Sequence, residues 1–234
     1  MGPPGPTVYI PPPDFEGERA GVSGDLYRHL FRARRLARGD ALRVVDGDGH
    51  ARAARIDEVG KDGASLALGE SLPVVEPALR LTLLVAMPRP ERASWLVEKA
   101  TELGVDRILW LRTERGPRAC TESVLERHDR VAQAAMQQCG GARLPRLGGP
   151  VEWATLAERL ESMDGAWVLD AGGEGVPQPA ADGRCGLLVG PEGGWTEAER
   201  AELTDMGCRS WSLGERVLRV ETAALVGAGT LLSV

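Results

Sequence analysis

The hydrophobic and polar residues of the 234-residue chain follow two patterns, which change near residue 73. In residues 41–56, ALRVVDGDGHARAARI, apolar and polar side chains alternate on both sides of an Asp-Gly pair. Alternation with a period of two predicts strands with one buried face, and Asp-Gly is a strong hairpin signal. Residues 63–68 read as a further strand and residues 28–38 as a short helix. We therefore expect a small β-rich barrel or sheet over residues 1–73.

After a candidate linker at residues 70–80, continuous apolar runs alternate with amphipathic segments. The predicted strands are residues 79–87, 107–113, 166–171, 186–190 and 209–214. The predicted helices are residues 92–103, 121–139, 153–163, a helix after Thr196 that ends near Gly207, and 221–234. Thr196 and Glu199 form a capping box, and Gly104 suits a helix end. Strands that alternate with helices indicate an α/β domain with a mostly parallel sheet and helices on both faces.

Composition restricts the class of protein. The hydrophobic fraction of 43% and the charged fraction of 26% are ordinary for a soluble globular protein. No apolar run approaches the roughly 18 residues that span a bilayer, and the first residues do not resemble a secretory signal, so we expect a cytoplasmic protein. The four cysteines lack CxxC spacing and the three histidines do not cluster, so neither a metal site nor a redox pair is predicted.

One stretch combines the end of a predicted strand with a glycine-rich turn. Residues 187–199, LLVGPEGGWTEAE, run from an apolar segment through Gly-Pro-Glu-Gly-Gly into a capped helix. Ligands of open α/β sheets bind beyond the carboxyl ends of strands, and glycine lets the backbone approach them closely. The loop lacks the spacing of a nucleotide-binding fingerprint, and Glu192 would repel a phosphate. A purely structural strand-to-helix turn is the alternative.

A second stretch repeats this arrangement one unit later. Residues 212–225, SLGERVLRVETAAL, place a glycine after another predicted strand, and Arg216, Arg219 and Glu221 crowd the start of the next helix. Two such loops can form one pocket. Their backbone amides and carbonyls could read the edge of an adenine.

These two motifs together resemble the SPOUT superfamily of knotted methyltransferases. Within it, the chain resembles the family that methylates uridine N3 in small-subunit ribosomal RNA. Residues 28–40, 86–105 and 112–116 add supporting matches to the family's N-terminal domain, first catalytic strand and helix, and following loop. The resemblance covers nearly the whole chain.

The resemblance implies a PUA-like RNA-binding barrel over residues 1–73 and a methyltransferase domain with a trefoil knot over residues 74–234. It implies a homodimer, 16S ribosomal RNA as partner and S-adenosylmethionine as cofactor. Asp170 lies at a further strand end near the implied cofactor site. The implied cofactor-binding residues are Leu169, Gly190, Pro191, Glu192, Gly193, Leu213, Gly214, Val217, Leu218, Arg219 and Thr222.

One segment departs from the family pattern. Residues 137–145 read QQCGGARLP, so Gln137 stands where the family has an acid and Gly141 where it has an arginine. Arg143 is a candidate replacement for that arginine.

The implied reaction assigns roles to two residues. Uracil N3 carries a proton and is a poor nucleophile until the proton leaves. Arg219 is expected to stabilise the developing anion through a uracil carbonyl. Glu221 is expected to accept the proton or to orient Arg219, with an ordinary ion pair at the helix start as the alternative. Glu192 is expected to cap neighbouring amides or to contact substrate.

The RNA contacts are predicted from local charge, because the net charge of −6 argues against indiscriminate nucleic-acid binding. Residues 28–38 contain five arginines and no acid, which favours phosphate contacts. The candidates are Arg32, Arg35, Arg89, Lys99 and Arg115. A solvated charged face is the alternative for each arginine, and an intrahelical ion pair for Lys99.

Two other functions remain open at this point. The chain could be a non-catalytic RNA-binding factor of ribosome assembly that kept the fold, or a SPOUT methyltransferase that acts on another RNA, such as transfer RNA. The intact GPEGG and LGERVLRVETA motifs argue against the assembly factor. A measurement of cofactor binding distinguishes an enzyme from a non-catalytic RNA-binding factor.

Overall fold

The computed structural model describes residues 5–15, 17–33, 35–116, 120–173 and 175–233, apart from the side chains of residues 29, 32 and 33. The chain divides into two compact units. The first unit comprises Met1–Glu76 and Met136–Leu144, and the second comprises Pro77–Ala135 and Pro145–Val234. The hydrophobic pattern contains no signal that residues 136–144 return to the first unit.

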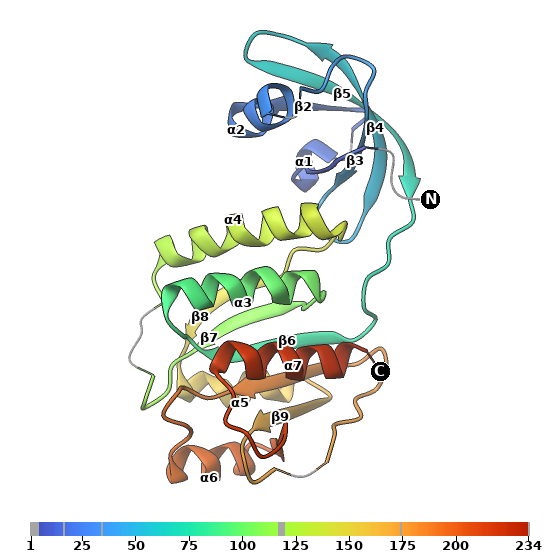
Figure 1. Ribbon diagram of the computed structural model, residues 1–234. Coiled ribbons are helices and arrows are strands. Elements are labelled where there is room, and N and C mark those ends of the chain that lie inside the picture. Colours follow the sequence, from blue (N-terminus) through green and yellow to red (C-terminus); the bar gives the residue numbers. More distant parts are fainter. Residues whose placement is uncertain (1–4, 16, 34, 117–119, 174, 234) are drawn as a thin grey trace. The chain divides into compact units, whose positions relative to one another are not determined.

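The first unit is built on a curled five-stranded sheet of order β1-β3-β4-β5-β2 (Figure 1). Its strands are β1 (Thr7–Tyr9), β2 (Arg19–Ser23), β3 (Ala41–Val45), β4 (Ala51–Val59) and β5 (Gly63–Leu72), and its helices are α1 (Pro12–Phe15), α2 (Gly24–Tyr27) and η1 (Arg28–Ala33). Neighbouring strands are antiparallel except for the parallel pair β1 and β3. The predicted β-rich fold is confirmed, whereas the helix expected over residues 28–38 is shorter.

The predicted hairpin is formed by β3 and β4. The carboxylate of Asp46 accepts hydrogen bonds from the backbone N–H groups of Asp48 (2.8 Å) and His50 (3.0 Å). Gly47 and Gly49 have φ values of +81° and +104°, which side-chain-bearing residues rarely adopt. The turn therefore needs both the acid and the glycines that signalled it.

The second unit contains a six-stranded sheet of order β11-β9-β10-β6-β7-β8. Its strands are β6 (Arg80–Ala86), β7 (Arg107–Leu111), β8 (Arg146–Val151), β9 (Gly165–Leu169), β10 (Arg184–Val189) and β11 (Arg209–Trp211). Every neighbouring pair is parallel, so the predicted α/β class is confirmed. The trefoil knot that the resemblance implies stays a prediction.

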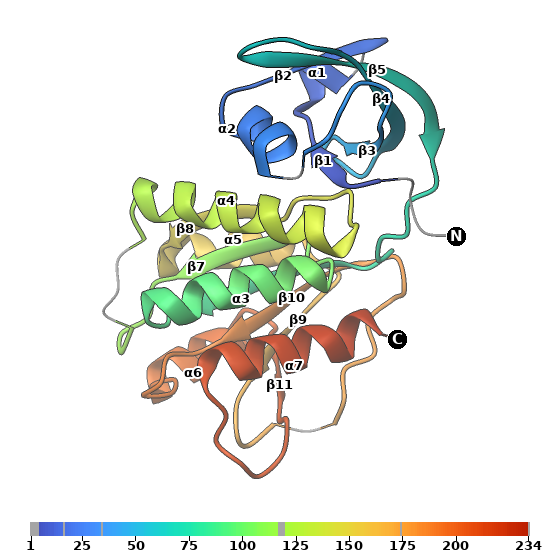
Figure 2. The ribbon, with the colours of Figure 1, turned by 45° about the horizontal axis from the view of Figure 1, so that its top comes forward.

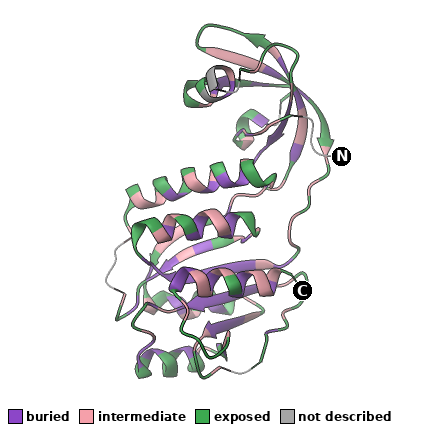
Figure 3. Ribbon diagram, viewed as in Figure 1, coloured by how far each residue is buried: buried purple, intermediate pink, exposed green. Residues whose placement is uncertain are grey.

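Helices cover both faces of this sheet (Figures 1 and 2). They are α3 (Pro90–Glu102), α4 (Glu122–Cys139), η2 (Trp153–Thr155), α5 (Leu156–Glu161), α6 (Glu197–Asp205) and α7 (Val220–Leu232). Leu156 and Leu160 of α5 and Leu203 of α6 pack with Leu84 and Leu188 from one face. The helices α3 and α7 contact each other on the other face. The central strands β6 and β10 are almost wholly buried, as Figure 3 shows.

The edge strand β8 was not predicted, because its Gly-Gly-Pro sequence argues against a strand. The peptide bond between Gly149 and Pro150 is cis, and the pairing with β7 is irregular between Leu109 and Leu111. A Cβ on Gly149 would lie 2.8 Å from the carbonyl oxygen of Trp110. Proline is tolerated at sheet edges and bulges, and β8 is at the edge.

Candidate functional site

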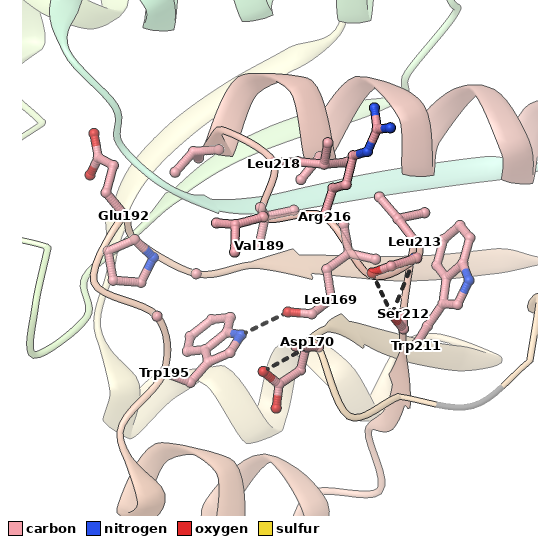
Figure 4. Close-up of a pocket in the computed structure, with 18 of the residues that line it drawn as sticks. Leu169, Asp170, Val189, Glu192, Trp195, Trp211, Ser212, Leu213, Arg216 and Leu218 are labelled. Carbon is pink, nitrogen blue, oxygen red and sulfur yellow. Dashed lines mark hydrogen bonds between the residues drawn. The ribbon is translucent and has the colours of Figure 1, made fainter.

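The candidate site lies where three neighbouring strands of the second unit end. The strands β11, β9 and β10 are adjacent and parallel, so the segments after their carboxyl ends meet at one edge of the sheet. They enclose a pocket of about 310 Å³, shown in Figure 4. The lining residues are Leu169, Asp170, Ala171, Val189, Gly190, Pro191, Glu192, Gly194, Trp195, Arg200, Trp211, Ser212, Leu213, Gly214, Glu215, Arg216, Val217, Leu218, Val220 and Ala223.

The loop after β10 is held by a buried tryptophan. Trp195 is 2% exposed, and its Nε1 donates a hydrogen bond to the carbonyl oxygen of Leu169 (3.1 Å; Figure 4). A Cβ on Gly190 would lie 2.8 Å from the indole ring, closer than real Cβ contacts come. Gly194 has a φ of +69° and closes a turn onto Pro191. Gly190 is therefore required for the packing of Trp195, and Gly194 is required for the turn.

An acid and an arginine from different elements meet in the lining. Arg200 of α6 donates two hydrogen bonds to the carboxylate of Asp170, at 2.7 and 3.3 Å, and the bond with Asp170 raises the pKa of Arg200. Asp170 follows β9, and its backbone N–H donates to the carbonyl oxygen of Trp211. The position of Asp170 at a strand end is predictable from the sequence. Its partner Arg200 is not, because it lies 30 residues further along the chain and belongs to no motif.

The loop after β11 forms the open side of the pocket. Gly214 has a φ of +117°, and its N–H donates to the hydroxyl of Ser212. Leu213 and Leu218 are partly exposed, and Val217 is 98% exposed. Apolar side chains left this open at the mouth of a pocket suit contact with a ligand or a second chain.

The structure brings most of the predicted cofactor residues together. Those in the lining are Leu169, Gly190, Pro191, Glu192, Leu213, Gly214, Val217 and Leu218. Gly193, Arg219 and Thr222 are not among the lining residues. The backbone carbonyl of Gly193 instead accepts a hydrogen bond from Arg115.

The two predicted catalytic residues occupy different environments. Arg219 is exposed and directly precedes α7 as its N-cap residue. Glu221 is 3% exposed and forms an ion pair with Arg92 of α3. Sequence reasoning missed Arg92, because 129 residues separate it from its partner. An ion pair at the start of α7 therefore exists, but its cation is Arg92.

The predicted RNA contacts occupy both units. In the first, the side chain of Arg32 lies outside the described residues, and Arg35 is exposed with a φ of +56°. In the second, Arg89 is exposed just before α3, and Lys99 forms ion pairs with Glu98 and Glu102, each at 2.8 Å. The guanidinium of Arg115 bonds to Gly193 at 2.8 Å. Lys99 thus makes the intrahelical pairs named as its alternative.

The segment that departs from the family pattern makes contacts within the first unit. The side-chain oxygen of Gln137 accepts a hydrogen bond from the backbone N–H of Tyr9 (3.1 Å). The carbonyl oxygen of Gly141 accepts one from buried Arg43 (3.1 Å). The guanidinium of Arg143 lies against Gly49 in the hairpin turn. Both departing residues therefore take part in the packing of this unit.

The cysteines fall into two groups. Cys185 and Cys208 are buried, and burial raises their pKa values to about 12 and about 11. Cys120 is partly exposed and Cys139 is exposed. Across the described ranges, no group of cysteine, histidine and acidic residues is arranged to hold a metal ion. In the same ranges, no helix has the length and apolar character needed to cross a membrane.

Comparison with known proteins defines the class first. Residues 75–232 match the model of an RNA methyltransferase domain, and residues 22–68 match an RNA methyltransferase PUA domain. The chain is 33% identical to ribosomal RNA small subunit methyltransferase E of Mycobacterium tuberculosis, over 92% of this chain and 86% of that protein. It is 25% identical to the Bacillus subtilis protein of that name, over 90% of this chain and 88% of that one. The chain therefore belongs to the ribosomal RNA small subunit methyltransferase E family.

Solved structures agree with this assignment. A Legionella pneumophila methyltransferase in complex with S-adenosylmethionine is 26% identical with a TM-score of 0.85, covering 97% of this chain and 96% of that one. Ribosomal RNA small subunit methyltransferase E of Neisseria gonorrhoeae, also bound to S-adenosylmethionine, is 25% identical with a TM-score of 0.85, covering 95% and 94% of the two chains.

Proposed function

We propose that this protein uses S-adenosylmethionine to methylate N3 of a uridine in 16S ribosomal RNA. The observation that carries the proposal is the pocket at the ends of β9, β10 and β11, in a chain whose relatives are named for small-subunit ribosomal RNA methylation. Two similar structures hold this cofactor. We further propose that the first unit contacts the RNA.

The lining of the pocket fits S-adenosylmethionine. Its volume of about 310 Å³ is within the range of small-ligand sites. Leu169, Leu213 and Leu218 supply apolar surface for the adenine. Gly190, Gly194 and Gly214 also line the pocket, where the lack of a side chain lets a ligand approach the backbone closely. Asp170 and Glu192 place carboxylates in the lining, and the Asp170 carboxylate is paired with Arg200. Arg216 adds a second guanidinium, so the lining offers both signs of charge to a ligand. When bound, the cofactor supplies a methyl group activated by a sulfonium.

The residues of the chain must then prepare the uracil. We assign Arg219 to one uracil carbonyl, because it is exposed beside the loop that forms the open side of the pocket. A guanidinium there stabilises the negative charge that develops when the N3 proton leaves. Glu221 is buried against Arg92, so we assign it to fixing the start of α7 rather than to accepting the proton. Alignment of N3 with the methyl group lowers the barrier further.

We propose that the protein is a cytoplasmic homodimer. Trp95 of α3 and Val226 of α7 are each 45% exposed, and these helices contact each other. Large apolar side chains on one helical layer favour burial by a second copy. The proposal of a homodimer rests on the family and on this exposed surface, and the proposal of a cytoplasmic location rests on the family alone.

The test is methyl transfer from labelled S-adenosylmethionine to small ribosomal subunits from a strain that lacks this activity. The product nucleoside is identified by mass spectrometry, and we expect 3-methyluridine at one position. Label in another RNA only would favour the alternative substrate, and the absence of both transfer and cofactor binding would favour an assembly factor. Arg219→Ala is expected to lower turnover while cofactor binding persists.

A further inference from the structure

A turn outside the pocket contacts the loop that lines it. Residues 113–116 follow β7 and form a turn in which the N–H of Gly116 donates to the carbonyl oxygen of Thr113 (3.2 Å). We call these residues the TERG turn. None of them lines the pocket. In the sheet, β6 separates β7 from β10, so the turn reaches past one strand end to the loop at residues 190–194.

Arg115 makes the first of two connections. Its Nη1 donates a hydrogen bond to the carbonyl oxygen of Gly193 (2.8 Å). A Cβ on Gly193 would lie 3.3 Å from Cδ of Arg115, so the aliphatic stem packs directly on the glycine. Gly193 is the only residue of 190–194 that does not line the pocket, and its carbonyl oxygen is bonded to Arg115. The hydrogen bond fixes the direction of this peptide group.

Glu199 makes the second connection. It is 6% exposed, and its two carboxylate oxygens have different partners. Oε2 accepts a hydrogen bond from the N–H of Thr196 (2.8 Å), as a capping box requires. Oε1 accepts one from the N–H of Glu114 in the TERG turn (2.9 Å). The second bond has no part in capping α6, so a buried carboxylate joins the TERG turn to Thr196, which follows Trp195 at the end of this segment.

We propose that Arg115 and Glu199 are positioning residues that hold residues 190–194 in the shape that binds the cofactor. The inference rests on the proposed function, because it assumes that this loop binds S-adenosylmethionine. It gives Arg115 a role that needs no RNA. An arginine that served only as a phosphate contact would leave cofactor binding unchanged when RNA is absent.

The test is the dissociation constant of S-adenosylmethionine, measured by calorimetry without RNA. Arg115→Ala removes one charge-assisted hydrogen bond and is expected to weaken binding about fivefold. Glu199→Gln leaves one acceptor oxygen for two N–H groups and is expected to weaken it at least as much. The double variant is expected to be less weakened than the product of the two single effects, because both act on one loop.

Two controls separate positioning from general stability. Arg112→Ala removes a neighbouring exposed arginine, paired with Glu152, that makes no hydrogen bond to the loop among those of the described residues, so cofactor affinity should not change. Thr196→Val removes the other half of the capping box and lowers the melting temperature, yet it should weaken cofactor binding less than Glu199→Gln does. Melting temperatures are measured for all variants.

The outcomes are distinct. Wild-type affinity in Arg115→Ala, with reduced RNA methylation, would overturn the role of Arg115 in favour of an RNA contact. Wild-type affinity in Glu199→Gln, or an equal loss in Thr196→Val, would overturn the role of Glu199. Because Arg115 is exposed, its variant is expected to fold. If the wild-type protein itself bound no cofactor, the proposed function would fail instead.

Discussion

At the scale of single residues, close packing against Trp195 allows only glycine at position 190 of the pocket lining. The glycine directly follows the buried strand β10 and lies against the ring of Trp195. That contact leaves no room for a side chain, whatever ligand the loop binds. The glycine-rich motif of residues 190–194 therefore reflects the scaffold as much as the ligand.

We predict that Gly190→Ala destabilises the protein by about 1–3 kcal/mol, because overpacking forces the indole or the backbone to move. Gly172→Ala is the matched control, since a Cβ there meets nothing within 4 Å. Its free energy of unfolding should stay within about 0.5 kcal/mol of the wild type. Urea unfolding measures the free energy of unfolding of both variants. Equal stability of the two would contradict the prediction, because it would show that the Trp195 ring moves aside without a cost in stability.

The pair of Arg92 and Glu221 gives a second prediction at this scale. Arg92→Met leaves the buried carboxylate of Glu221 without its cation. We expect a loss of about 2 kcal/mol, below the range for fully buried pairs because the Arg92 side chain is 42% exposed. The double variant with Glu221→Met should regain part of this stability in urea unfolding. A double variant less stable than Arg92→Met would contradict this account.

At the scale of elements, α4 packs on β7 through a buried histidine. His128 is 1% exposed, and its ring centroid lies 5.2 Å from that of Trp110. Burial, helped by the charge of Arg127, lowers the pKa of His128 from 6.5 to about 4. Between these values the unfolded chain binds a proton that the folded protein does not, so stability falls as the pH falls.

We predict a loss of up to about 1.4 kcal/mol for each pH unit below 6.5 from this residue. His128→Leu should flatten the dependence of unfolding free energy on pH between 6.5 and 5. A slope that is unchanged in His128→Leu would contradict the role of burial.

The elements also show where prediction from sequence succeeds. The hairpin turn and the capping box were predicted because their signals are local: an Asp-Gly pair, and Thr196 three residues before Glu199. The edge strand β8 was missed because its glycines and proline resemble a loop. No local pattern predicts the pairs of Arg92 with Glu221 and of Arg200 with Asp170, because the partners are distant in sequence and meet only in the folded chain. The pocket was largely predicted because it follows strand ends.

At the scale of the whole molecule, the proposed homodimer has a direct test. The chain has a mass of 25.0 kDa, so light scattering should give about 50 kDa, twice that value. Val226→Glu places a charge on the exposed face of α7 and should return the mass to that of one chain. A wild-type mass of one chain at micromolar concentration would contradict the proposal.

The measurement that tests the central claim most directly is the calorimetric titration of S-adenosylmethionine into the wild-type protein and into Ala223→Leu. Ala223 lies on α7 and lines the pocket, so a larger side chain there occupies the space assigned to the cofactor. We predict one site per chain in the wild type and binding at least about tenfold weaker in the variant, from a loss of about 1.4 kcal/mol or more, with a similar melting temperature. Equal affinity in the two proteins would place the cofactor elsewhere and contradict the account.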